Sequence, residues 1–94
     1  MDLYEILRAK GAATAAVEMR LGANIVYKVM SDPESKSHRS PSDDFLVAAQ
    51  RAWPGHLDLH GTLRRLHPDW DAVRVSAEAA VIVAKAAVPL EAAS

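Results

Sequence analysis

The chain has no cysteine, which excludes disulfides and thiolate metal sites and fits a reducing compartment. Aromatic residues make up only 5% of its 94 residues, so a core must be built largely from closely packed alanine and valine, a composition that favours helices. The longest apolar run, residues 79 to 84, is far shorter than the roughly 20 residues that cross a bilayer. The start, with Asp2, Glu5 and Arg8, does not resemble a signal peptide. We therefore expect a cytoplasmic protein without membrane contact.

The chain also lacks an excess of positive charge, since its formal net charge is -1. Lysine and arginine supply much of the affinity for nucleic acid by neutralising phosphates, so any DNA-binding surface on this chain must be local. The best candidate is residues 28 to 39, where three basic side chains accompany two acidic ones and His38. These five charged residues are Lys28, Lys36, Arg39, Asp32 and Glu34.

The length fits one small domain, and apolar residues at helical spacing predict three short helices in its first third. The predicted helices are residues 2–10, 13–21 and 25–30. Gly11 ends the first of them, and Asn24 is a candidate N-cap of the third. The buried side of the third helix consists of Val26, Val29 and Met30, and its outward side of Asn24, Tyr27 and Lys28.

Residues 31 to 41 are polar and rich in serine and proline, which predicts a loop. A fourth helix follows, with Ser40 as the expected N-cap, Pro41 in the first helical position, and Asp43 and Asp44 at the positive end of the helix dipole. Its buried stripe is Phe45, Leu46, Ala49 and Trp53. Pro54 and Gly55 end it.

The C-terminal part is predicted to contain two further helices. The first, within residues 57 to 67, has Leu59, Leu63 and Leu66 on one side. The second extends from about Trp70 to Val88 with Asp69 as its cap; its valine triplets also suit strands, but the alanines favour a helix. We expect residues 89 to 94 to fray. The fold class is therefore all-α, a small helical bundle in one domain, with a core of residues 2–54 and a helical extension of residues 55–94.

The second and third predicted helices carry a pattern of small and apolar residues. Ala16 is small where the next helix would cross, and the surrounding apolar positions are Ala15, Met19, Leu21, Val26 and Val29. Further on, a polar loop leads to Ser40-Pro41-Ser42 and the apolar segment FLVAAQRAW. Over residues 3 to 54 this pattern resembles the helix-turn-helix DNA-binding domains of the phage repressor and Cro type, also called XRE-like domains.

The chain departs from that family at the turn between the second and third helices. The family has glycine where Arg20 stands here, and Gly22 lies two residues later. A residue other than glycine with positive φ at this point costs on the order of 1 kcal/mol. The turn is therefore expected to be atypical.

The resemblance implies a sequence-specific transcriptional regulator of phage or bacterial repressor type, whose third helix enters the major groove of double-stranded DNA. The implied DNA-binding residues are Ala23, Asn24, Tyr27, Lys28, Lys36 and Arg39. Asn24 would pair with adenine, Lys28 with guanine or a phosphate, and Tyr27 with a phosphate or a thymine methyl, while the last two contact the backbone. A homodimer on paired half-sites is expected, with the last helix as the dimer contact.

Other chemistry has little support in the sequence. His56 and His60 stand four residues apart, as in some zinc sites, but no glutamate follows His56, and Pro54 and Gly61 interrupt the helix that would present the pair. The sequence contains no nucleophile elbow and no phosphate-binding glycine loop. We therefore expect no enzymatic activity, no metal and no cofactor.

A second class of function fits the same composition. The near-neutral charge and the apolar segment VSAEAAVIVAKAAV also suit a small helical protein that binds another protein, for example an antirepressor, an antitoxin or a phage-encoded inhibitor. Residues 70 to 90 would then contact the partner. A DNA binder concentrates positive charge near Lys28, whereas a protein binder exposes an apolar patch.

Overall fold

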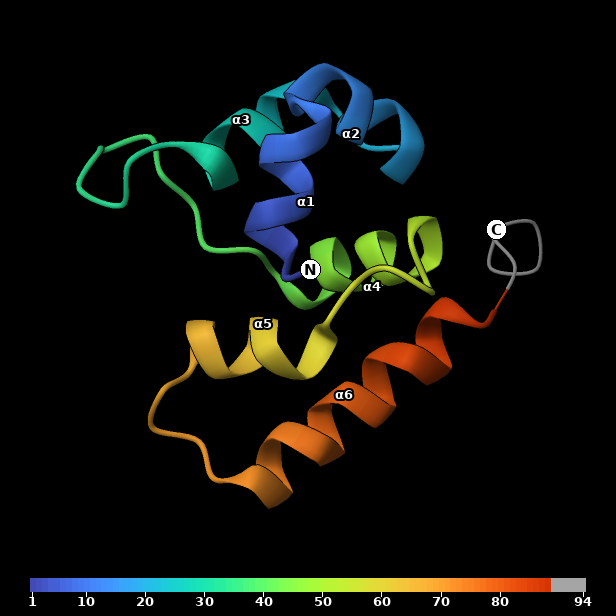
Figure 1. Ribbon diagram of the computed structural model, residues 1–94. Helices are drawn as coiled ribbons and strands as arrows, with labels where there is room; N and C mark the ends of the chain where they lie inside the picture. Colours follow the sequence, from blue (N-terminus) through green and yellow to red (C-terminus); the bar gives the residue numbers. More distant parts are fainter. Residues whose placement is uncertain (89–94) are drawn as a thin grey trace.

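A computed structural model describes residues 1–88, and within that range the chain forms six α-helices and no strand, as the sequence predicts (Figure 1). The helices are α1 (Leu3–Lys10), α2 (Ala12–Met19), α3 (Ala23–Met30), α4 (Asp43–Ala52), α5 (Leu59–Leu66) and α6 (Ala72–Ala86). The predicted fraying of residues 89 to 94 lies outside the described residues. No helix in the described range combines the length and the apolar character needed to cross a membrane.

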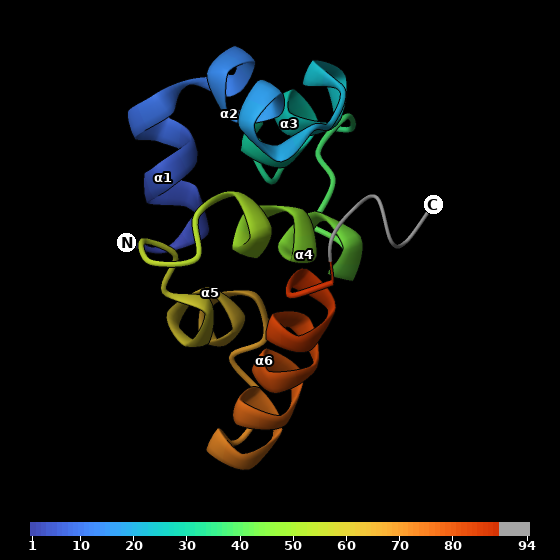
Figure 2. The ribbon, with the colours of Figure 1, turned by 90° about the vertical axis from the view of Figure 1, so that its right-hand side faces the viewer.

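The helices are arranged around α4. Figures 1 and 2 show α2 and α3 at one end of the molecule and α5 and α6 at the other, with α4 between them. α4 packs against both α2 and α6, and α5 packs against α1 and α6. The guanidinium of Arg51 on α4 donates to the carbonyl oxygens of Lys85 and Val88, each at 3.3 Å, and so fixes the C-terminal end of α6.

One hydrophobic core contains side chains from all six helices. Its members include Leu7, Ala16, Val26, Leu46, Leu63 and Ile82, one from each helix in chain order. Ala15 and Ala49 are fully buried, so several contacts between helices are made by small side chains. The core is built as the composition predicts, and the C-terminal helices contribute to it directly.

The first residues of the chain are bonded to the segment before α5. The Met1 amino group donates to the His56 carbonyl oxygen at 3.1 Å, and the Asp58 amide donates to the Met1 carbonyl oxygen at 2.7 Å. The buried hydroxyl of Thr62 accepts the Leu3 amide at 3.0 Å and donates to the Asp58 carbonyl oxygen at 2.8 Å. The start of α1 therefore depends on α5 for its buried hydrogen bonds.

Three predicted helix caps differ from the structure. α4 is capped by Ser42, whose hydroxyl accepts the Phe45 amide, so Ser40 and Pro41 precede the helix. α6 is capped by Asp71 and not Asp69, because residues 67 to 70 form a turn in which the Trp70 amide donates to the His67 carbonyl oxygen. α3 begins directly after Gly22, so Asn24 is its second residue and does not cap it.

The turn between α2 and α3 has the unusual conformation that the sequence indicates. Arg20 adopts φ 59° and ψ 41°, and within residues 1–88 no other residue except glycine has positive φ. The amide of Leu21 donates to the Ala16 carbonyl oxygen at 3.0 Å, which closes the end of α2 in the manner of a Schellman motif. α2 therefore ends at Met19, two residues earlier than predicted.

Arg20→Gly is expected to stabilise the protein by about 1 kcal/mol, because glycine adopts the left-handed region without a Cβ clash. The measurement is the free energy of unfolding from denaturant titration. Arg20→Ala is the control, since alanine removes the same charge but keeps the Cβ, and it should give no stabilisation. If both variants stabilise equally, the gain comes from losing the arginine side chain and not from the backbone.

Candidate nucleic-acid interface

The candidate interface is centred on the exposed side of α3. Val26 and Val29 are buried on its inner side, which fixes the rotation of the helix about its axis. The residues on the outer side are Ala23, Asn24, Tyr27 and Lys28, and all four are exposed. Ile25 is also half exposed, a feature that the sequence analysis did not single out. The structure thus brings four of the six predicted residues to one helix surface.

The loop after α3 folds back onto the end of that helix. The Lys28 carbonyl oxygen accepts the Arg39 amide at 3.1 Å and the Ser31 hydroxyl at 2.7 Å. The Nδ1 of His38 lies 3.1 Å from the Ser31 carbonyl oxygen and donates to it. These bonds satisfy carbonyls at the end of α3 and place Arg39 beside Lys28 through the backbone.

The loop and the outer side of α3 form one surface. A shallow hollow of about 390 Å³ is lined by Tyr27, Lys28 and Met30 from the helix and by Ser31 and Ser37 from the loop. Lys36 is the neighbour of Ser37, is exposed, and makes no hydrogen bond or ion pair within residues 1–88. The two loop cations that the sequence analysis named therefore belong to the segment that borders α3.

The charge of this surface is positive by a small margin. Lys28, Lys36 and Arg39 contribute three positive charges against two from Asp32 and Glu34, a difference of one. The Asp32 carboxylate accepts the Glu34 amide at 2.9 Å, which gives it a structural role in the loop turn. A surface with so small an excess of positive charge attracts phosphate groups only weakly.

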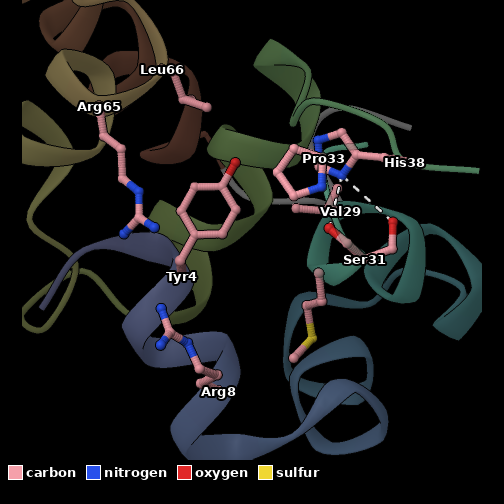
Figure 3. A pocket seen from close by; sticks show the side chains of 9 residues that line it. Tyr4, Arg8, Val29, Ser31, Pro33, His38, Arg65 and Leu66 are labelled. Carbon is pink, nitrogen blue, oxygen red and sulfur yellow. Dashed lines mark hydrogen bonds between the residues drawn. The ribbon is translucent and has the colours of Figure 1, made fainter. Parts of the chain in front are cut away.

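A second concave feature lies beside α3 and was not predicted. It is a groove of about 330 Å³ between α1, the end of α3 with its loop, and α5 (Figure 3). Tyr4, Arg8 and Arg65 line one side, and Ser31, Pro33 and His38 line the other. Because these residues come from three segments far apart in the sequence, no local pattern could have placed them together.

Side chains near the start of the chain hold Arg65 in this groove. Its guanidinium donates to the Asp2 carboxylate at 2.9 Å and lies 4.6 Å from the centre of the Tyr4 ring. Burial acts to raise the pKa of Asp2, but hydrogen bonds from the Glu5 amide and Arg65 outweigh it, so the pKa lies below its usual value. Arg64 and Arg65 are both exposed, and the side chain of Arg65 keeps half of its surface open to solvent while it contacts Asp2 and Tyr4.

The histidine pair shows no assembled metal site. His56 lies in the turn before α5 and His60 in its first turn. Within residues 1–88 no three histidine or acidic side chains come together in an arrangement that could hold a metal ion. Asp43 and Asp44 occupy the first turn of α4, where the helix dipole favours carboxylates.

Comparison with known proteins identifies no relative: no family model, no curated protein and no solved structure matches this chain.

Proposed function

We propose that the chain is a sequence-specific DNA-binding regulator of transcription that reads the major groove with α3. The observation that carries the proposal is the combination of a short α2 to α3 turn with an α3 whose outer side is polar and exposed. A helix of this kind, anchored by two buried valines and free on its other side, has the dimensions that a major groove admits. No covalent chemistry or cofactor is needed for this function.

The proposed contacts follow from side-chain chemistry. Asn24 has the donor and acceptor pair that matches the N6 and N7 edge of adenine, and Lys28 donates to guanine or to a phosphate. Tyr27, 59% exposed, offers a ring edge to a thymine methyl and a hydroxyl to a phosphate. Ala23 is the first residue of α3, and its small side chain allows close approach of the helix N-terminus.

Asn24→Ala and Lys28→Ala are each expected to weaken specific DNA binding by about 1 to 3 kcal/mol, with Lys28→Ala also reducing the salt dependence. The measurement is affinity for a selected binding sequence at two salt concentrations. Arg64→Ala serves as a control, because Arg64 is exposed on α5 and belongs neither to α3 nor to the loop that follows it. Unchanged affinity in both α3 variants would refute the assignment of this helix.

The proposed regulator acts as a homodimer through the exposed side of α6. The strip directly opposite the buried residues of α6, continued beyond the helix to Val88, consists of alanine and valine, namely Val73, Ala77, Ala80, Val81, Ala84 and Val88. Other exposed residues, which include Arg74, Ser76, Val83 and Lys85, flank this strip. Val73 is 79% exposed and Val81 47% exposed, so this side is unusually apolar for a surface helix. α6 lies at the end of the molecule away from α3, so a dimer through it leaves α3 free (Figure 1).

The spacing of this apolar side fits a second copy of the same helix. Its successive residues are separated by four, three, one, three and four positions, a sequence of intervals that reads identically in both directions. An antiparallel copy related by a two-fold axis between Ala80 and Val81 therefore places Val73 against Val88, Ala77 against Ala84 and Ala80 against Val81. Valine meets valine at the ends, and small residues allow close approach near the axis.

Charged residues beside the apolar side agree with this register. Glu78 and Lys85 are seven residues apart and form no ion pair within residues 1–88. In the antiparallel pair, Lys85 of one copy lies about 3 Å along the axis from Glu78 of the other, within reach of a lysine side chain. Arg74 lies on the same flank of α6, and its guanidinium carbon stacks 4.3 Å from the centre of the Trp70 ring.

The alternative function, a helical regulator that binds a different protein and no DNA, uses the same side of α6. The exposed valines of this helix are the observation that favours it. The two functions differ in what the purified chain does alone. A homodimeric regulator associates with itself and retains DNA, whereas the alternative is a monomer that retains none.

A further inference from the structure

The groove between α1, α3 and α5 has apolar walls and a cationic rim. Val29, Met30 and Leu66 provide aliphatic surface, and the ring of Tyr4 provides an aromatic side (Figure 3). Its volume of about 330 Å³ lies at the lower end of the range for small-molecule sites. The dimensions suit a compact organic molecule rather than a peptide.

All the ionisable groups at this groove except Tyr4 are basic. Arg8, Arg65 and His38 line it, and no acidic side chain does. The guanidinium of Arg8 makes no hydrogen bond or ion pair within residues 1–88, and Arg8 occupies an exposed position of α1. Arg65 is partly neutralised by Asp2, which lies outside the groove lining. Arg8 is therefore the cation free to bind an anion.

Two further polar groups line the groove, the hydroxyl of Tyr4 and the ring of His38. Burial raises the pKa of Tyr4 against the opposing effect of Arg65, so the hydroxyl keeps its proton at neutral pH. Figure 3 shows this hydroxyl pointing away from α1 toward the space between Leu66 and Pro33. His38 is fixed on the opposite side because its Nδ1 donates to the Ser31 carbonyl oxygen at 3.1 Å. The ring orientation is thus set before any ligand enters.

From this arrangement we propose that the groove binds a small organic anion with an apolar body, its carboxylate or phosphate held by Arg8 and its body packed between Tyr4, Met30 and Leu66. The walls include the end of α3 and the loop that returns to it through Arg39. Occupancy therefore contacts the same loop that borders the candidate DNA surface. The binding itself does not depend on the proposed DNA-binding function.

The test uses benzoate as the probe anion, benzamide as its neutral counterpart and inorganic phosphate as an anion without an apolar body. Each is titrated into the isotope-labelled full chain, and backbone amide shifts are followed by NMR. Benzoate is expected to give saturable shifts at residues of α1, of the end of α3 and of Leu66. Benzamide and phosphate should each bind about tenfold more weakly, because each lacks one of the two recognised features.

Paired variants separate this site from general attraction to positive charge. Arg8→Gln is expected to weaken benzoate binding about tenfold. Arg64→Gln removes the same charge from an exposed residue that does not line the groove, and it should leave binding unchanged. The proposal is overturned if benzoate gives no saturable shift, if Arg8→Gln has no effect, or if phosphate binds as well as benzoate. DNA binding is measured separately, so failure here leaves the regulator proposal untouched.

Discussion

Replacing Ala80 with glutamate is expected to dissociate the proposed α6 dimer into monomers. Ala80 is exposed on α6, and in the antiparallel pair it lies beside the two-fold axis, opposite Val81 of the second copy. In the proposed pair, the two glutamates introduced by the change would be buried close together without positive partners, which carries a large energetic penalty. The dimer dissociation constant should rise by at least about a hundredfold.

Sedimentation or light scattering over a range of concentrations measures this change, and Ala9→Glu is the matched control. Ala9 is exposed on α1, so it receives the same substitution away from α6. Its oligomeric state should stay that of the native chain. A native chain that is monomeric at every concentration would show that the proposed dimer does not form. A dimer that survives Ala80→Glu would show that the two copies contact each other through another surface.

Leu63→Ala is expected to reduce the free energy of unfolding by about 2 to 5 kcal/mol, a large part of the total for a domain of this size. Leu63 is 2% exposed in α5, which packs on both α1 and α6. Loss of its side chain leaves a cavity in the core that the N-terminal and C-terminal helices share. Because that core is common, α1 to α6 should unfold in one transition.

Chemical denaturation followed by helix content and by tryptophan fluorescence tests this expectation. Both variants are made in a Trp70→Phe background, because Trp70 lies between α5 and α6. The remaining Trp53 follows α4, which packs on α2 and α6, so its fluorescence reports on a different region from Leu63. Leu21→Ala is the control, because Leu21 is only partly buried and its truncation should cost less. Separate transitions for the two signals would mean that the C-terminal helices form an independent unit.

The order and type of the helices were predictable because the signals are local. Apolar spacing, Gly11 and the buried residues of α4 lie within single segments, and the structure agrees with each. The first residues of α4 and α6 were not predicted correctly, because each segment contains two candidate caps two residues apart. The choice between Ser40 and Ser42, or between Asp69 and Asp71, depends on where the preceding loop ends, which the sequence does not specify.

The two candidate sites also differ in how far the sequence alone could predict them. The outer side of α3 was predictable, since the burial of Val26 and Val29 fixes which residues of one helix face outward. The groove was not, because Tyr4, His38 and Arg65 come together only through the packing of α1 and α5 and the return of the loop. The hydrogen bond from Leu3 to Thr62 joins residues 59 positions apart, which no periodicity reveals.

We propose that this chain binds specific DNA sequences with paired α3 helices. The most direct test is selection of bound sequences from random duplex DNA, repeated at two salt concentrations. If α3 binds DNA as a pair, a motif made of two related half-sites is enriched, and affinity falls as salt rises. No enriched motif, together with weak binding that disappears at moderate salt, would contradict the proposal and would favour a protein partner for this chain.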